Sequence, residues 1–182
     1  MDDYEFTIED KYLKNINFNG VLLVSSKRDE NGNFKVKFLE RKNGGEPQFI
    51  DDLYEDNPHI RKRIEKEFYE TLIFVLQSNS ASIASAMALA EYDIYNIKLK
   101  RNSYLMASLI GLISAYPIGV GLTLATTDSG KAAVLIFGGV IIAMASLKMF
   151  MNFETYVKLV KKAEAEYKQF VLDEGNKLIR KK

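Results

Sequence analysis

Two long runs without charged residues dominate the pattern of hydrophobic and polar positions along the chain. No residue is charged between Arg101 and Asp128, and none is charged from Ala132 to Leu147. About twenty apolar residues are enough to cross a hydrocarbon core roughly 30 Å thick. We therefore predict membrane spans at about residues 103–126 and 132–151, with Lys148 extending its charged end toward the lipid headgroups.

The segment between the two runs reads Thr127-Asp-Ser-Gly-Lys131, which is short and rich in turn-forming residues. The two spans are therefore expected to form an antiparallel helical hairpin. Basic residues flank the spans on the side away from this turn: Lys98, Lys100, Arg101 and Lys148. By the positive-inside rule, both termini should lie in the cytoplasm and the turn outside. The alternative is a buried helical hairpin in a soluble protein, but a chain of this size could hardly cover two such helices.

Apolar residues at helical spacing continue beyond both predicted spans. Before the first span the stripe consists of Ile83, Met87, Ala90, Ile94 and Ile97, and after the second span it consists of Tyr156, Val160, Ala163, Tyr167 and Phe170. This spacing predicts two continuous helices, at about residues 80–126 and 132–175, each about twice as long as the hydrocarbon is thick. Half of each helix would then stand in the cytoplasm as a stalk, and the aromatic residues would pack in its core.

A separate helix is expected ahead of the stalk. Asn57 followed by Pro58 is a helix start signal, and the helix should run to about Leu76 before a break at residues 77–80. Residues 71–90 also lack charge, but their Gln, Asn and Ser content makes them a poor span. We place this run in the cytoplasm, with a re-entrant or pore-lining segment as the alternative.

The N-terminal part has a different pattern. Residues 19–26 and 33–41 are strand-like, and the segment Lys27-Arg-Asp-Glu-Asn-Gly32 between them ends in a hairpin-turn signal. Phe34, Val36 and Phe38 alternate with Lys35 and Lys37, which predicts one dry and one wet face. An isolated two-stranded hairpin is marginal in water, so its dry face must rest on the neighbouring helix, on Tyr12 and Leu13, or on another subunit.

These elements define a mainly α membrane protein with four regions. We expect a cytoplasmic head with a β-hairpin at residues 1–56, cytoplasmic helices at 57–101, the transmembrane hairpin at 102–151 and a cytoplasmic C-terminal helix at 152–182. The head is acidic, with 13 Asp and Glu against 8 Lys and Arg, although the whole chain of 182 residues has a formal net charge of only +1. The start Met1-Asp2-Asp3 is unlike a secretory signal, and the lack of cysteine excludes disulfides and cysteine-ligated metal.

The chain offers little that resembles catalytic chemistry. His59 is the only histidine, and it follows a helix start beside the basic group at residues 61–63. The acidic cluster at residues 51–56 lacks the alternating ligands of a calcium loop, and acids before a helix are favoured by its dipole. We expect no enzyme activity, no cofactor and no metal site. The basic groups at residues 61–63 and 180–182 could meet RNA, but anionic lipid is the simpler partner and nucleic acid is not expected.

Small residues recur through both predicted spans. In the first span they are spaced by four, at Ser103, Ala107, Gly111, Ala115, Gly119 and Thr123, and in the second span the main ones are Gly139 and Ala143. Small side chains allow the close backbone approach on which helix packing in lipid depends. One hairpin needs a single seam, so we predict that these residues also form an oligomer or pore seam. Pro117 should kink the first span, because it removes a backbone hydrogen bond.

The layout resembles the SLATT family of bacterial two-transmembrane effectors. The resemblance covers about residues 57–182 and rests on a helix leading into the first span, a tight outer turn, a second span and the charged helix Tyr156-Val-Lys-Leu-Val-Lys-Lys-Ala-Glu-Ala-Glu-Tyr-Lys-Gln-Phe170. It implies a homo-oligomer in the bacterial inner membrane that acts in anti-phage defence once a protein or nucleotide triggers it. The β-hairpin head departs from the family pattern and would be the sensing or docking part.

Three functions follow as hypotheses. The first is a membrane effector that oligomerises and forms a pore or disrupts the inner membrane on a signal. The second is a non-enzymatic membrane anchor or adaptor that recruits a cytoplasmic partner through the acidic head. The third, an enzyme built around His59 and residues 51–56, has the least support from the sequence.

Overall fold

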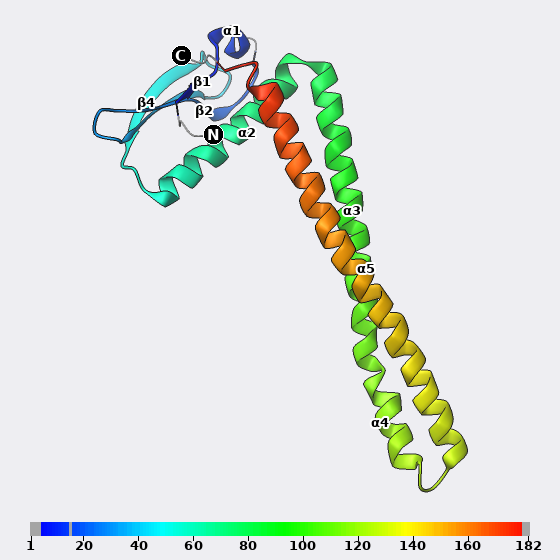
Figure 1. The fold of residues 1–182 in the computed structure, drawn as a ribbon. Coiled ribbons are helices and arrows are strands. Elements are labelled where there is room, and N and C mark those ends of the chain that lie inside the picture. The colour runs from blue at the N-terminus through cyan, green and yellow to red at the C-terminus, as the bar shows by residue number, and fades with distance from the viewer. Residues whose placement is uncertain (1–4, 15, 180–182) are drawn as a thin grey trace. The chain divides into compact units, whose positions relative to one another are not determined.

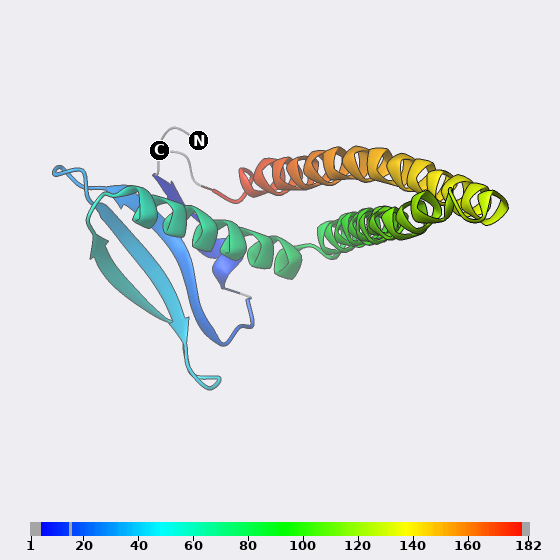
Figure 2. The same ribbon diagram turned by 90° about the horizontal axis from the view of Figure 1, so that it is seen from below.

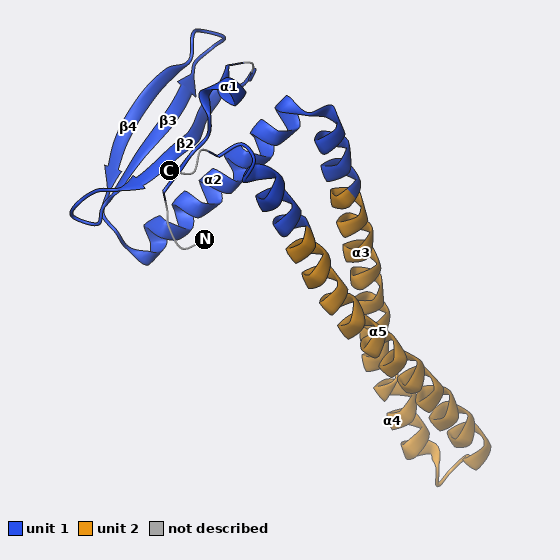
Figure 3. Ribbon diagram, turned by 45° about the horizontal axis from the view of Figure 1, so that its top comes forward, with its two compact units in different colours: residues 1–89, 167–182 blue, residues 90–166 orange. Residues whose placement is uncertain are grey.

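The computed structural model describes residues 5–14 and 16–179, so the predicted basic group at 180–182 and the first four residues lie outside the described part. Within that part the chain is mainly helical, with a small N-terminal antiparallel β-sheet and two long apolar helices (Figure 1). The chain divides into two compact units (Figure 3). Unit 1 comprises residues 1–89 and 167–182, and unit 2 comprises residues 90–166.

Unit 1 contains a four-stranded antiparallel sheet whose strands follow each other in chain order: β1 (Phe6–Thr7), β2 (Gly20–Arg28), β3 (Phe34–Arg41) and β4 (Gln48–Tyr54). The predicted hairpin is confirmed as β2 and β3, and Gly32 in its turn has a φ of 83°, which favours glycine. Phe34 and Val36 are buried while Lys35 and Lys37 are exposed, as the alternation predicted, but Phe38 is only half-buried and the next residue, Leu39, is buried. Strands β1 and β4 were not predicted, because β1 is very short and β4 carries Asp51-Asp52 in its middle.

Helix α2 (Pro58–Asn79) lies against one face of this sheet (Figure 2). The Asn57 side chain accepts a hydrogen bond of 2.9 Å from the Ile60 amide, which confirms the predicted helix start. The Phe68 ring packs on Phe6 of β1, and the Leu23 amide of β2 donates to Thr71 Oγ1 at 3.2 Å. The neighbouring helix is therefore the element that covers the dry face of the hairpin.

Both ends of the described chain close the core of unit 1. Val171, near the end of α5 (Ser129–Gly175), is fully buried, and Ile179 forms an antiparallel bridge with Ile8. The Glu9 amide, just ahead of the short helix α1 (Asp10–Leu13), donates to the Leu178 carbonyl at 3.1 Å. The core thus joins segments separated by almost the whole length of the chain.

The uncharged run at residues 71–90 belongs to the same core. Leu72, Val75, Leu76 and Met87 are all buried in it, and α2 ends at Asn79, as the predicted break requires. This burial accounts for the apolar residues at 72–76 and at 87 without a membrane, whereas Leu89 at the end of the run is 63% exposed.

Unit 2 is built from three helices: α3 (Ala81–Ile113), α4 (Ala115–Leu124) and α5 (Ser129–Gly175). The first residues of α3 and the last residues of α5 belong to unit 1. The predicted second helix is confirmed as α5, which is continuous over 47 residues. The predicted first helix is interrupted at Ser114, where α3 ends and α4 begins.

A cavity in the core of unit 1 should lower its stability. Leu72 is fully buried, and replacing it with alanine removes contacts that the packed neighbours cannot fully restore. We expect Leu72→Ala to cost about 2–5 kcal/mol and to speed amide hydrogen exchange in β2 and β3 of the full chain. Val21→Ala is the control, since Val21 is exposed; equal exchange in the two variants would contradict this core.

Candidate functional site in the two apolar helices

The apolar side chains of the two long helices are largely uncovered. The segments Ala81–Leu124 and Ser129–Gly175 are long and apolar enough to cross a membrane, judged by length and composition. Only 11% of the most apolar window of each segment is buried within the structure. The apolar surface therefore does not serve as the interior of this chain, unlike a core helix of a soluble protein.

The contact between these helices within unit 2 depends on glycine. A Cβ added at Gly111 of α3 would lie 2.5 Å from Cβ of Ser146 in α5, and one added at Gly121 of α4 would lie 3.0 Å from the Ala132 carbonyl oxygen. A Cβ at Gly139 of α5 would meet Ile118 and would lie 3.1 Å from the Ser114 carbonyl oxygen. The contact at Gly111 is closer than a real Cβ approaches, and the two contacts with carbonyl oxygens are tighter than most. The helices therefore touch where one of them has no side chain.

Two further contacts extend the same register toward the charged segments. The Tyr104 and Tyr156 rings stack with their centroids 5.1 Å apart, and Lys98 Nζ pairs with the Glu164 carboxylate at 2.7 Å. From Gly111–Ser146 through Tyr104–Tyr156 to Lys98–Glu164, the residue number falls along α3 by about as much as it rises along α5. The two helices are therefore antiparallel over this length. Tyr104 lies three residues after Arg101, and Tyr156 lies just beyond Lys148 and Glu154, so both rings are near the charged residues that flank the uncharged runs. Tyrosine favours such a position at a membrane surface. The sequence pattern had assigned Tyr156 only to helix packing.

Only some of the small residues predicted to form one seam lie in the contact between the two helices. Gly111 faces α5, and Ala107 beside it is partly covered, but Ser103, Ala115, Gly119 and Thr123 are exposed. Nothing lies within 4 Å of a Cβ added at Gly119. In α5, Gly139 is buried against α4 and Ala143 is partly covered. Ser146, which lies beside Gly139 and Ala143 in the small-residue pattern of the second span, is buried against Gly111. Gly121 and Ser114 were missed, because they follow alternating steps of three and four rather than a constant step of four.

The helix interruption at Ser114 lies three residues before Pro117. Proline has no amide hydrogen and its ring crowds the carbonyl four residues earlier, which here belongs to Ile113, the last residue of α3. The Ser114 amide bonds to the Gly111 carbonyl at 3.1 Å, and the Ser114 hydroxyl donates to the same carbonyl. Local side-chain bonding therefore satisfies backbone groups at the break.

Other hydroxyl groups in the apolar helices are also satisfied locally. Ser103 donates to the Leu99 carbonyl at 3.0 Å, Ser108 to Leu105 at 2.7 Å and Thr123 to Val120 at 2.8 Å. Hydroxyls bonded within their own helix can face lipid at low cost. The surface of the two helices is thus compatible with a hydrocarbon surrounding.

The predicted membrane-surface basic residues have different surroundings. Lys98 bridges to Glu164, the Arg101 guanidinium donates to the Asn102 side chain at 2.9 Å, and Lys100 and Lys148 are exposed. At the opposite end of the helices, Asp128 caps α5 by accepting from the Lys131 amide at 3.1 Å. Hydrogen bonds from Lys131 lower the pKa of the Asp128 carboxyl below its usual value.

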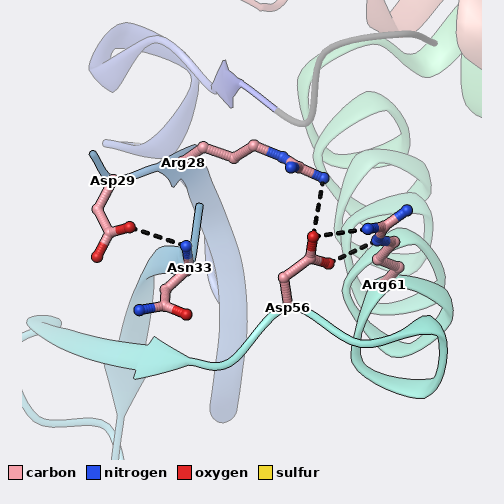
Figure 4. A network of polar contacts seen from close by, with 5 residues as sticks. All are labelled: Arg28, Asp29, Asn33, Asp56 and Arg61. Carbon is pink, nitrogen blue, oxygen red and sulfur yellow. Dashed lines mark hydrogen bonds and ion pairs between the residues drawn. The ribbon is translucent and has the colours of Figure 1, made fainter. Parts of the chain in front are cut away.

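The acidic cluster in unit 1 forms structural contacts. Asp56 accepts hydrogen bonds of 2.5 and 2.6 Å from the Arg61 guanidinium of α2 and pairs with Arg28 at the end of β2 at 3.4 Å (Figure 4). Asp52 accepts from the Tyr54 hydroxyl at 3.0 Å, and His59 is exposed. Among the described residues, no group of three or more His, Cys, Asp or Glu is placed to hold a metal ion.

Comparison of the chain with protein-family models, with curated proteins and with solved structures finds no match.

The close approach of α3 and α5 can be tested with an engineered disulfide, because the chain has no cysteine of its own. We expect Gly111→Cys with Ser146→Cys to form a disulfide within one chain after a small outward shift of the helices, since the two Cβ atoms would lie 2.5 Å apart in the unshifted structure and a disulfide needs about 3.8 Å. A protease site inserted in the turn between α4 and α5 separates the halves, which stay joined only if the bond has formed. Gly119→Cys with Ser146→Cys is the control; equal joining in both would refute the register.

The Asp56 network predicts a pH-dependent contribution to stability. Hydrogen bonds from Arg61 are the main cause that lowers the pKa of Asp56 below its ordinary value of 3.8, with Arg28 adding to the effect and burial opposing it. A carboxyl with a lowered pKa in the folded state stabilises the fold above its unfolded pKa, and this stabilisation is lost as the pH falls through the folded pKa.

We therefore expect Asp56→Asn to lower the thermal midpoint of unit 1 at pH 7. The gap to the unchanged protein should shrink as the pH falls below about 4. Circular dichroism of the full chain at pH 7, 5 and 3 measures this, with Glu55→Gln as the control at an exposed neighbour. A gap that is constant with pH would exclude the carboxylate charge as its cause.

Proposed function

We propose that this chain is a two-span protein of the bacterial inner membrane, with α3 and α4 forming one span, α5 the other, and both termini in the cytoplasm. The observation that carries the proposal is the exposed apolar surface, of which the chain itself buries only 11% in each window. Water would impose a large cost on such a surface, whereas lipid covers it without cost. The locally bonded hydroxyls and the glycine contacts support the same surroundings.

We further propose that the hairpins assemble and, on a signal, open a pore or disrupt the membrane. A single pair of helices packed through glycine leaves no room for a water path between them, so permeation needs several copies. The exposed Gly119 and Ala115 offer small-residue surface for such an assembly. The resemblance to SLATT effectors adds the expectation of a defence role, with unit 1 receiving a protein or nucleotide trigger.

A membrane anchor is the second candidate, and one observation in unit 1 favours it. Strand β4 is an edge of the sheet, and its Phe49 and Leu53 are more than half exposed. Exposed apolar residues on a strand edge are typical of a surface that binds another chain. In that case the only role of the spans would be to hold unit 1 at the membrane. Neither candidate function includes an enzyme activity.

Expression in bacteria distinguishes the two candidates. We expect the chain to stay in the membrane pellet after carbonate extraction and, when induced with its trigger, to collapse the membrane potential reported by a voltage-sensitive dye. Replacing residues 103–126 and 132–151 with unrelated spans should abolish depolarisation if the hairpin is the effector. Full function of the replaced chain would support the anchor instead, and release of the original chain by carbonate would overturn both.

A further inference from the structure

A second apolar stripe runs along α3, distinct from the residues that contact α5. Its positions alternate in steps of three and four: Tyr92, Tyr95, Leu99, Asn102, Met106, Leu109 and Ile113. The six apolar members are between 48% and 67% exposed, and Asn102 is exposed as well. The contact with α5 uses other positions, among them Lys98, Tyr104 and Gly111. The stripe therefore has no covering within the described part of unit 2.

Lipid can cover only part of this stripe. Tyr104 lies close to the level at which charged residues resume on α3, and Tyr92 and Tyr95 precede it by twelve and nine residues. At 1.5 Å per residue they lie about 18 and 14 Å beyond that level. The headgroup layer is only about 5–8 Å thick on each side. These two tyrosines therefore face water if the stripe has no protein partner.

Helix α5 shows what a face covered by lipid alone looks like. Its outward residues Val134, Phe137, Ile141 and Met144 are 66–72% exposed and lie within the uncharged run. Continued at the same steps of three and four, this face becomes Lys148, Met151, Thr155, Lys158 and Lys162. The outward face of α5 thus turns polar at the level where the lipid ends, whereas the face of α3 remains aromatic and apolar.

We propose that the outward stripe of α3, from Tyr92 to Ile113, is a homomeric interface that pairs in parallel with α3 of a second copy of this chain. Apolar residues at alternating steps of three and four form the seam of a parallel coiled coil. Copies inserted with the same topology present this stripe at the same height, so every position of the seam meets its own counterpart.

The charges flanking the stripe do not oppose a second copy in parallel, and Lys98 keeps its ion pair with Glu164. In this register the flanking positions pair Glu91 with Asn96 of the other copy, and Lys98 with Ser103 of the other copy. No two like charges oppose each other across the seam. Asn102 meets Asn102 at the level of the membrane surface, where a paired polar residue fixes register in coiled coils. An antiparallel pairing would instead bring Tyr92 close to Ile113, while Asn102, the middle position of the stripe, would meet its counterpart in either direction. The shared topology of the copies, and not Asn102, therefore selects the parallel pairing.

The inference rests on the proposed membrane topology and makes it more specific. It assigns assembly to large side chains of α3 that begin outside the lipid, whereas Ser103, Ala115, Gly119 and Thr123 occupy other positions of the helix. Gly111 and Gly139 are left to the contact within one chain. Assembly and hairpin packing then use separate faces and can be disrupted independently.

Disulfide cross-linking in native membranes tests the pairing. Single cysteines at Tyr92, Leu99 and Met106 should each yield oxidised dimers at least fivefold more than cysteines at Lys100, Thr155 or Lys162, which lie off the stripe or on α5. Cells expressing Tyr92→Cys and Ile113→Cys with different tags should give no mixed dimer. Equal cross-linking at all sites, a mixed dimer, or adducts only with other proteins would overturn the proposal.

The same samples separate the inference from the topology on which it rests. Recovery of the chain without detergent would refute the membrane proposal. In that soluble fraction, stronger cross-linking at the stripe positions than at the control positions would still support the pairing of α3, and equal cross-linking would still refute it. Native mass in detergent gives a second measurement: Tyr92→Glu with Leu99→Glu should reduce the oligomer to a monomer, and Lys158→Glu should not. The disulfide between positions 111 and 146, introduced into each of these variants, checks that they keep the contact between α3 and α5. An unchanged native mass of the variant with Tyr92→Glu and Leu99→Glu would refute the seam.

Discussion

The closeness of two helix backbones at Gly111, Gly121 and Gly139 is the constraint on which the arrangement of unit 2 depends. Association of apolar helices in lipid gains little from the hydrophobic effect, so van der Waals contact at short range carries much of the stability. Any side chain at these positions would separate the backbones. The same contacts fix the register, which brings Tyr104 beside Tyr156 and Lys98 beside Glu164.

Once the register is fixed, the remaining faces of the helices have different roles. The face of α5 that points away from the contact changes from apolar to lysine-rich within its length, as a lipid-exposed surface should. The outward face of α3 does not change in this way, and it carries tyrosines among charged neighbours. The two helices of a hairpin can look equally hydrophobic in composition and still face different environments.

Much of the helical architecture could be predicted from the sequence, because it depends on local signals. The uncharged runs, the start at Asn57-Pro58 and the break near Ser80 all act within a few residues. The contact face could not be predicted in the same way. A stripe with a constant step of four turns by about 40° at each step, so Ala115, Gly119 and Thr123 leave a face that Gly111 still occupies.

Unit 1 shows a second limit of sequence reasoning. The acidic pair Asp51-Asp52 masks β4, since strands seldom carry adjacent acids in their middle. Burial of Val171, Leu178 and Ile179 beside the N-terminal strands depends on long-range tertiary contacts that no local pattern encodes. The acidic residue with the clearest structural role, Asp56, could be found only once Arg28 and Arg61 were seen beside it.

The bridge between Ile8 and Ile179 has a consequence for biosynthesis. A ribosome makes the sheet first and the segment that completes its core only after both apolar helices have been translated. Unit 1 therefore cannot reach its final state before residue 179 has been translated. In the topology proposed above, the translocation machinery would insert the helices before the N-terminal module matures, so a nascent chain that stalls early would carry an unfinished module.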